Sequence, residues 1–175
     1  MAEEEEETSP SMIPTSMQFV IGNVNLVHAQ SLDEARAWAQ LDPHHAALGY
    51  ESSEVLRWIH NMEPELNVPV TQGECYIVMC RDAPASDARA PTREAHLGWL
   101  RESHRVLLAG PLLGADDSAV GTLLVVHGNG DELEDVREWA LKDPYALEGL
   151  FEEVFVAPIA AYGDIGQLCD TLPDN

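Results

Sequence analysis

The alternation of apolar and polar positions in the second half of the chain predicts four strands and two helices. Apolar runs rich in β-branched residues predict strands at 75–80, 106–109, 119–127 and 152–157, and apolar residues at helical spacing predict helices at 92–103 and 132–141. The resulting order, β-α-β-β-α-β, is that of the ferredoxin-like arrangement, in which two helices cover one face of a four-stranded sheet. The other apolar face also needs a cover, which the sheet of a second subunit would supply.

A shorter strand-helix-strand pattern precedes this unit. An apolar run predicts a strand at 18–28, and a second strand is predicted at 54–59. Between them, Ser31 and Glu34 have the spacing of a capping box, which predicts the start of a helix that ends before Asp42-Pro43. The remaining segments are predicted to be an acidic disordered tail (1–17), a linker (61–73) and an irregular C-terminal tail (161–175).

The two patterns share a repeated sequence motif, which indicates an internal duplication. Residues 36–43 and 137–144 both have the form Arg-x-Trp-Ala-x-x-Asp-Pro, and shorter matches continue on either side. The Trp and Ala of each copy are predicted to face a core, and the Asp to cap the following turn. The first copy, over 18–60, lacks a counterpart of the first strand and first helix. Either it adds strands to the sheet of the complete domain at 74–160, or Met1 is not the biological start.

Charge and cysteine content restrict the classes of partner. With 31 acidic and 9 basic residues, the net charge is −22, which disfavours binding to nucleic acid or to anionic membrane surfaces. The three cysteines are too few and too widely spaced for a disulfide framework, and Cys75 and Cys80 are predicted to be small core residues on opposite faces of one strand. No apolar run is long enough to span a membrane, so we expect a cytoplasmic protein, unless an organellar signal precedes Met1.

Several segments of the second unit, in matching order and spacing, resemble the YciI-type (YCII-related) domain. They are Arg93-Glu-Ala-His96-Leu97, Val106-Leu-Leu-Ala109-Gly110-Pro111-Leu112, Gly121-Thr-Leu-Leu-Val-Val126, Trp139-Ala-Leu-Lys-Asp143-Pro144-Tyr145 and Gly149-Leu-Phe151. The resemblance implies a homodimeric α/β-barrel built from ferredoxin-like units, and a cleft with a catalytic His–Asp pair that falls on His96 and Asp143. An enzyme that removes chloride from a chlorinated hydroxymuconate is similar to this family.

The residues themselves allow two interpretations of this pair. An imidazole with a pKa near ~6.5 can exchange a proton at neutral pH, and a position close to the helix N-terminus would favour its neutral form. Alternatively, His96 is a polar surface residue of its helix. Asp143 precedes Pro144, which predicts an N-cap, and one carboxylate oxygen could cap while the other orients His96.

The remaining predicted site residues bind substrate: Arg93, Asp82, Gly110, Pro111 and Tyr145. Arg93 either binds a substrate carboxylate or neutralises Glu94 or Asp82. His44 and His45 are adjacent and lack further ligands, so no metal is expected, and no cofactor motif is present. The sequence thus favours a small-molecule enzyme of the lyase (dehydrochlorinase), isomerase or hydrolase type acting on a carboxylate-bearing substrate. The alternative is a non-catalytic ligand-binding or assembly subunit.

Overall fold

The computed structural model describes residues 22–43, 52–60, 75–84 and 86–159. The chain divides into two compact units, 1–53 and 54–175, so the division falls inside the predicted half-repeat. The predicted tails, the linker and the segment with His44 and His45 lie outside the described residues.

The second unit contains the predicted ferredoxin-like fold. Its elements are β2 (Cys75–Asp82), α3 (Arg89–Glu102), β3 (Val106–Leu113), β4 (Ala119–His127), α4 (Leu133–Ala140), α5 (Pro144–Leu147) and β5 (Phe151–Pro158). Together with the two-residue strand β1 (Arg57–Trp58), these strands form a sheet of the order β1-β3-β4-β2-β5, and all its pairs are antiparallel. The α+β class and the β-α-β-β-α-β order are thus confirmed.

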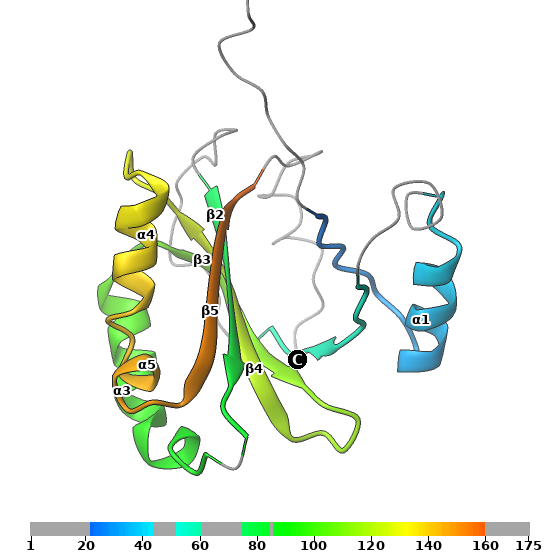
Figure 1. The fold of residues 1–175 in the computed structure, drawn as a ribbon, viewed down its shortest axis with the longest axis horizontal. Helices are drawn as coiled ribbons and strands as arrows, with labels where there is room; N and C mark the ends of the chain where they lie inside the picture. The colour runs from blue at the N-terminus through cyan, green and yellow to red at the C-terminus, as the bar shows by residue number, and fades with distance from the viewer. Residues whose placement is uncertain (1–21, 44–51, 61–74, 85, 160–175) are drawn as a thin grey trace, which may run out of the picture. The chain divides into compact units, whose positions relative to one another are not determined.

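The helices α3, α4 and α5 cover one face of this sheet (Figure 1). Alternate residues of the central strands point into the layer between sheet and helices, among them Val78 of β2 and Leu124 and Val126 of β4. They pack with Leu100 of α3 and Val136 of α4, which are also buried. This apolar layer fixes α3 and α5 over the sheet, and these two helices carry the candidate site.

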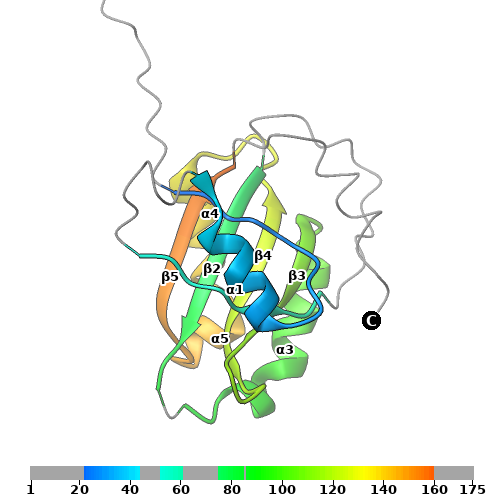
Figure 2. The same ribbon diagram turned by 90° about the vertical axis from the view of Figure 1, so that its right-hand side faces the viewer.

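The intervening residues of the strands form the second face of the sheet. Ile77, Val125 and Leu108 lie opposite one another on β2, β4 and β3 and are all buried. Figure 2 looks toward this face and shows the order of the four long strands across it. Cys75 and Cys80 are both buried, as predicted, and because they are five positions apart on β2 they lie on opposite faces.

The strand predicted at 54–59 is present only as β1 (Arg57–Trp58), and it does not close an N-terminal strand-helix-strand unit. It pairs antiparallel with Leu112 and Leu113 at the end of β3, and so joins the sheet of the second unit. This strand of the predicted half-repeat therefore adds to the sheet of the complete domain.

The first unit contains α1 (Leu32–Gln40), whose predicted cap at Ser31 is confirmed, whereas Glu34 reaches back to the Gln30 amide and not to the Ser31 amide of a capping box. The Glu34 amide donates to Ser31 Oγ at 3.2 Å, and the Gln30 amide donates to the Glu34 carboxylate at 2.7 Å. The strand predicted over 18–28 is wrong for its described part, since 22–28 form no strand and pair with no other described strand. The core-facing assignment of Trp38 is also wrong, because 46% of its surface is exposed.

Two element boundaries in the second unit differ from prediction. The helix expected at Thr92 begins at Arg89, because Pro91 falls in the first turn, where a missing amide hydrogen costs no intrahelical bond. The strand expected to end at Ala109 continues to Leu113, since a proline is tolerated near the edge of a sheet. Among the described residues, no helix is long and apolar enough to cross a membrane.

Candidate active site

The structure brings His96 and Asp143 together. His96 Nδ1 lies 2.8 Å from Asp143 Oδ1 and 2.9 Å from Oδ2, although 47 residues separate them in the chain. Both side chains are buried, with 5% and 2% of their surfaces exposed. Burial lowers the local dielectric and strengthens such a contact. The interpretation of His96 as a polar surface residue is therefore wrong.

Asp143 is held by its position between two helices. It follows the last turn of α4 and is the N-cap of α5, where its Oδ1 accepts a hydrogen bond from the Tyr145 amide at 2.9 Å. Pro144 occupies the first helical position, and Gly149, with φ of +70°, lies just beyond the end of this short helix. The predicted cap is confirmed, and the same carboxylate also contacts the imidazole.

His96 is positioned by α3, but not near its N-terminus as predicted. The helix begins at Arg89, so His96 lies two turns inside it. The field of the helix dipole falls off within the first turn, so the predicted influence of the helix N-terminus on this side chain does not apply. The group in contact with its Nδ1 is Asp143.

Tyr145 lies between this pair and the Arg89–Asp82 ion pair. Its ring stacks on the His96 imidazole with centroids 4.0 Å apart, and the Arg89 guanidinium lies 4.9 Å from its centroid. Phe151 contacts the same ring edge-on. Burial raises the pKa of Tyr145, while the positive charges of Arg89 and Arg93 partly oppose that rise. The phenol thus stays protonated at neutral pH beside two cations.

Arg89 is a site residue that the sequence interpretation missed. Its Nε and Nη2 donate to the two Asp82 oxygens at 2.8 and 2.6 Å, and Nη2 also bonds to Gly121 O and Thr122 Oγ1 at 3.2 Å. The predicted helix starts after Pro91, which places Arg89 in a loop. A proline in a first helical turn is the signal that could have placed it correctly.

Asp82 therefore takes part in an internal ion pair with Arg89. The Cys80 thiol lies nearby on β2, and its pKa is raised well above the usual range, chiefly by burial and further by the negative charges of Asp143 and Asp82. A thiol with so high a pKa is a poor nucleophile. The site is thus built around imidazole and carboxylate, not around this cysteine.

Comparisons with known proteins concern the second unit. Residues 75–160 match the YCII-related domain. An uncharacterized protein of Haemophilus influenzae is 33% identical, and Protein YciI of Escherichia coli 34% identical, each over an aligned length of 91 residues; the match covers 47% of this chain and 93% of the relative. The chain belongs to the YCII-related family.

Among solved structures, the chain is similar to 5-chloro-2-hydroxyhydroquinone dehydrochlorinase from Burkholderia phenoliruptrix, in complex with 2,5-dihydroxybenzoquinone. The identity is 26% and the TM-score 0.43, over 47% of this chain and 90% of that chain. The residues His96, Asp143, Tyr145, Arg89 and Asp82 all lie within the region that matches the YCII-related domain.

The other predicted site residues of this YCII-related domain are dispersed. Arg93 lies on α3 one turn before His96, with its side chain 55% exposed and 3.5 Å from Glu94. Gly110 and Pro111 lie on β3 and contact the β1 segment: the Trp58 indole donates to Gly110 O at 3.1 Å, and the Ile59 amide donates to Pro111 O at 3.2 Å. Tyr145 thus contacts the His96 pair directly, and Arg89 connects Asp82 to Tyr145. Gly110 and Pro111 contact the β1 segment instead.

Proposed function

We propose that this YCII-related domain is a small-molecule enzyme in which His96 exchanges a proton with a carboxylate-bearing substrate and Asp143 orients the imidazole. The observation that carries the proposal is the contact of both Asp143 oxygens with His96 Nδ1 in a buried setting. A carboxylate accepts hydrogen bonds only, so Nδ1 is the nitrogen that bears the proton. The lone pair of the neutral ring is then on Nε2.

This tautomer suits general acid–base catalysis. Nε2 can accept a proton from the substrate and return it later, while Asp143 stabilises the imidazolium formed in between. Stacking on Tyr145 limits rotation of the ring. In a dehydrochlorination, His96 would take a proton from the substrate as chloride leaves with the C–Cl electron pair. Isomerases and hydrolases of this type would use the same proton acceptor.

The charge distribution supports an anionic substrate. Arg89 is already paired with Asp82 inside the domain, whereas Arg93 is more than half exposed and has a longer contact with Glu94. A guanidinium in this state can pair with a carboxylate from solution. In a chain with a net charge of −22, a local cation is needed to attract such a substrate.

Proton exchange with solvent tests this proposal even when the product of the reaction is unknown. The protein is incubated in D2O with a panel of 2-oxo acids, unsaturated dicarboxylates and chlorinated hydroxymuconates, followed by proton NMR and chloride release. We expect deuterium uptake or turnover for at least one compound, reduced about 10²–10⁴-fold in His96→Asn. Asparagine retains an N–H near the position of Nδ1 but lacks Nε2.

His104→Asn is the matched control, because His104 is exposed and has φ of 51°, a conformation that asparagine tolerates. It should leave the rate unchanged. Turnover by His96→Asn close to that of the unaltered protein would refute the catalytic role of the imidazole.

A second candidate function is binding without turnover. It is favoured by one observation: Trp58 and Ile59 cover Gly110 and Pro111, two residues predicted to contact substrate. On this account, compounds of the same panel bind, as measured by calorimetry, but none is converted or exchanges a proton. Conversion that depends on His96 would exclude it.

A further inference from the structure

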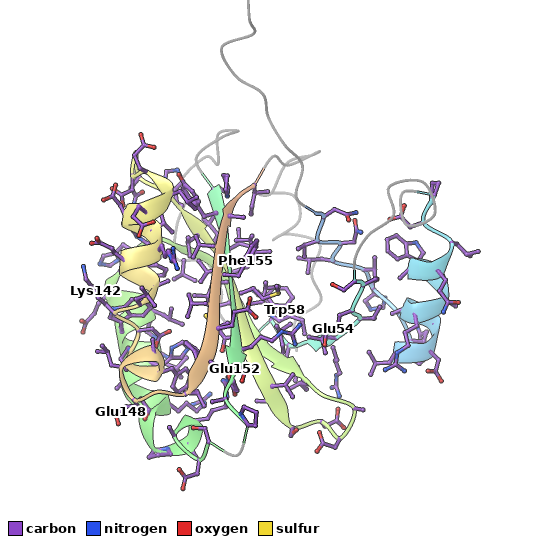
Figure 3. All side chains as sticks on the ribbon, in the orientation of Figure 1. Glu54, Trp58, Lys142, Glu148, Glu152 and Phe155 are labelled. Carbon is purple, nitrogen blue, oxygen red and sulfur yellow. The ribbon has the colours of Figure 1, made fainter. Side chains whose placement is uncertain are left out.

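A short segment crosses the second face of the sheet, the face opposite the helices. We call Glu54–His60, which contains β1, the strap. At one end Glu54 forms an ion pair with Arg81 of β2, and in the middle Arg57 pairs with Asp117 at 2.7 Å, in the turn between β3 and β4. Figure 3 shows Glu54 and Trp58 on one side of the sheet and Lys142 and Glu148 on the other.

The strap approaches β3 closely because Gly110 has no side chain. A Cβ at Gly110 would lie 1.8 Å from Ile59 O and 3.0 Å from Trp58 Nε1. The backbone of the strap thus occupies the space that a side chain would fill, and the Trp58 and Ile59 hydrogen bonds hold it there. Any larger residue at this position is incompatible with the observed placement of the strap.

The face under the strap is apolar. Leu108, Leu112 and Leu123 point to this face from β3 and β4, and each has at most 7% of its surface exposed within a single chain. A sheet face of this composition is stable only when something covers it. The match to the YCII-related domain begins at residue 75, so the strap lies outside the shared region.

We propose that the strap occupies this face in place of a second copy of the chain, and that the chain does not self-associate through the face while the strap is bound. The net charge of −22 works in the same direction, since two copies repel each other. The homodimer predicted from the sequence would require this face to be open. In this chain, the strap is the occupant.

Gly110→Ala tests the proposal in the full chain. The added methyl group on β3 would overlap the Ile59 carbonyl and so displace the strap from the sheet. Hydrogen exchange of the Ile59 amide, which is bonded to Pro111 O, reports whether the strap is bound, and sedimentation over a concentration series reports self-association. Runs at about 0.15 M and 0.5 M salt separate charge repulsion from occupancy of the face. We expect a protected Ile59 amide and a monomer for the unaltered chain. In Gly110→Ala, the amide should exchange at least about tenfold faster and the chain should form a dimer.

Gly98→Ala, on α3 with nothing within 4 Å of its Cβ, is the control and should resemble the unaltered chain. If Gly110→Ala does not fold, Glu54→Gln with Trp58→Phe weakens the strap from its own side, and the same two measurements apply. A strap that is released while the chain stays monomeric at both salt concentrations would overturn the proposal. So would an unaltered chain that dimerises with its Ile59 amide still protected.

Discussion

At the scale of the residue, a few buried or partly buried polar side chains form a continuous series. Asp82 holds Arg89, Arg89 lies over Tyr145, Tyr145 stacks on His96, and His96 contacts Asp143. Asp82 and Asp143 lie at the two ends of this series, and Arg89 and His96 contact them, so each carboxylate has a partner. The sequence identifies His96 and Asp143. It does not identify Arg89, because the role of that residue depends on where α3 begins.

The Cys80 thiol lies beside this series, and its ionisation should make the stability of the chain depend on pH under alkaline conditions. Its pKa is raised in the folded chain, so above about pH 8.5, the usual value for a thiol, the unfolded chain loses a proton that the folded chain keeps. The free energy of unfolding should therefore fall with rising pH, by up to about 1.4 kcal/mol per pH unit for this group. Below that pH both states keep the proton, and Cys80 adds no pH dependence.

Urea unfolding at several values between about pH 8 and 9.5 measures this slope. Cys80→Ala and Cys80→Ser should both reduce it by the same amount, although they differ in volume and hence in absolute stability. An unchanged slope in both variants would show that the thiol ionises equally in the folded and unfolded chains.

At the scale of the element, the two copies of the repeated sequence motif have different environments. Trp139 stacks on Trp99 with centroids 4.5 Å apart and carries the Arg105 guanidinium on its ring, whereas Trp38 is largely exposed. The sequence predicts the helices α1 and α4 correctly, but assigns the tryptophan of both copies to a core. It does not predict what each helix packs against, because α3 supplies Trp99 to the second copy and the first copy has no equivalent helix among the described residues.

This difference gives a matched pair of substitutions. Trp139→Ala should lower the free energy of unfolding by about 3 kcal/mol, since it removes an aromatic stack and leaves a void between α3 and α4. Trp38→Ala should change it by less than about 0.5 kcal/mol, as is usual for exposed positions. Denaturant unfolding followed by circular dichroism measures both, and equal losses would mean that the two copies pack alike.

At the scale of the whole molecule, the ferredoxin-like unit follows from hydrophobic period alone. The four strands and two helices have alternation strong enough to specify their type, and their order has one common arrangement. The hydrophobic period does not predict where the strand of the N-terminal half-repeat pairs. A strand needs a partner, and the sequence does not say that 57–58 pairs with Leu112 and Leu113 of the complete domain.

The candidate site is likewise predicted only in part from the sequence. Motif spacing indicates His96 and Asp143, but only the packing of α3 against α5 puts their atoms within 3 Å. Gly110 and Pro111, named with them from the same resemblance, are instead in contact with the strap. Long-range placement of this kind depends on which segment covers the second face of the sheet, and local sequence does not encode it.

The central claim is that Asp143 holds the His96 imidazole with its proton on Nδ1. Nitrogen-15 NMR of histidine-labelled protein at neutral pH tests it most directly, with the His96 signals assigned by their loss in His96→Asn. The account predicts a proton on Nδ1 in slow exchange with water, and its loss of protection in Asp143→Ala. A neutral ring with its proton on Nε2, or a His96 spectrum unchanged by Asp143→Ala, would contradict it.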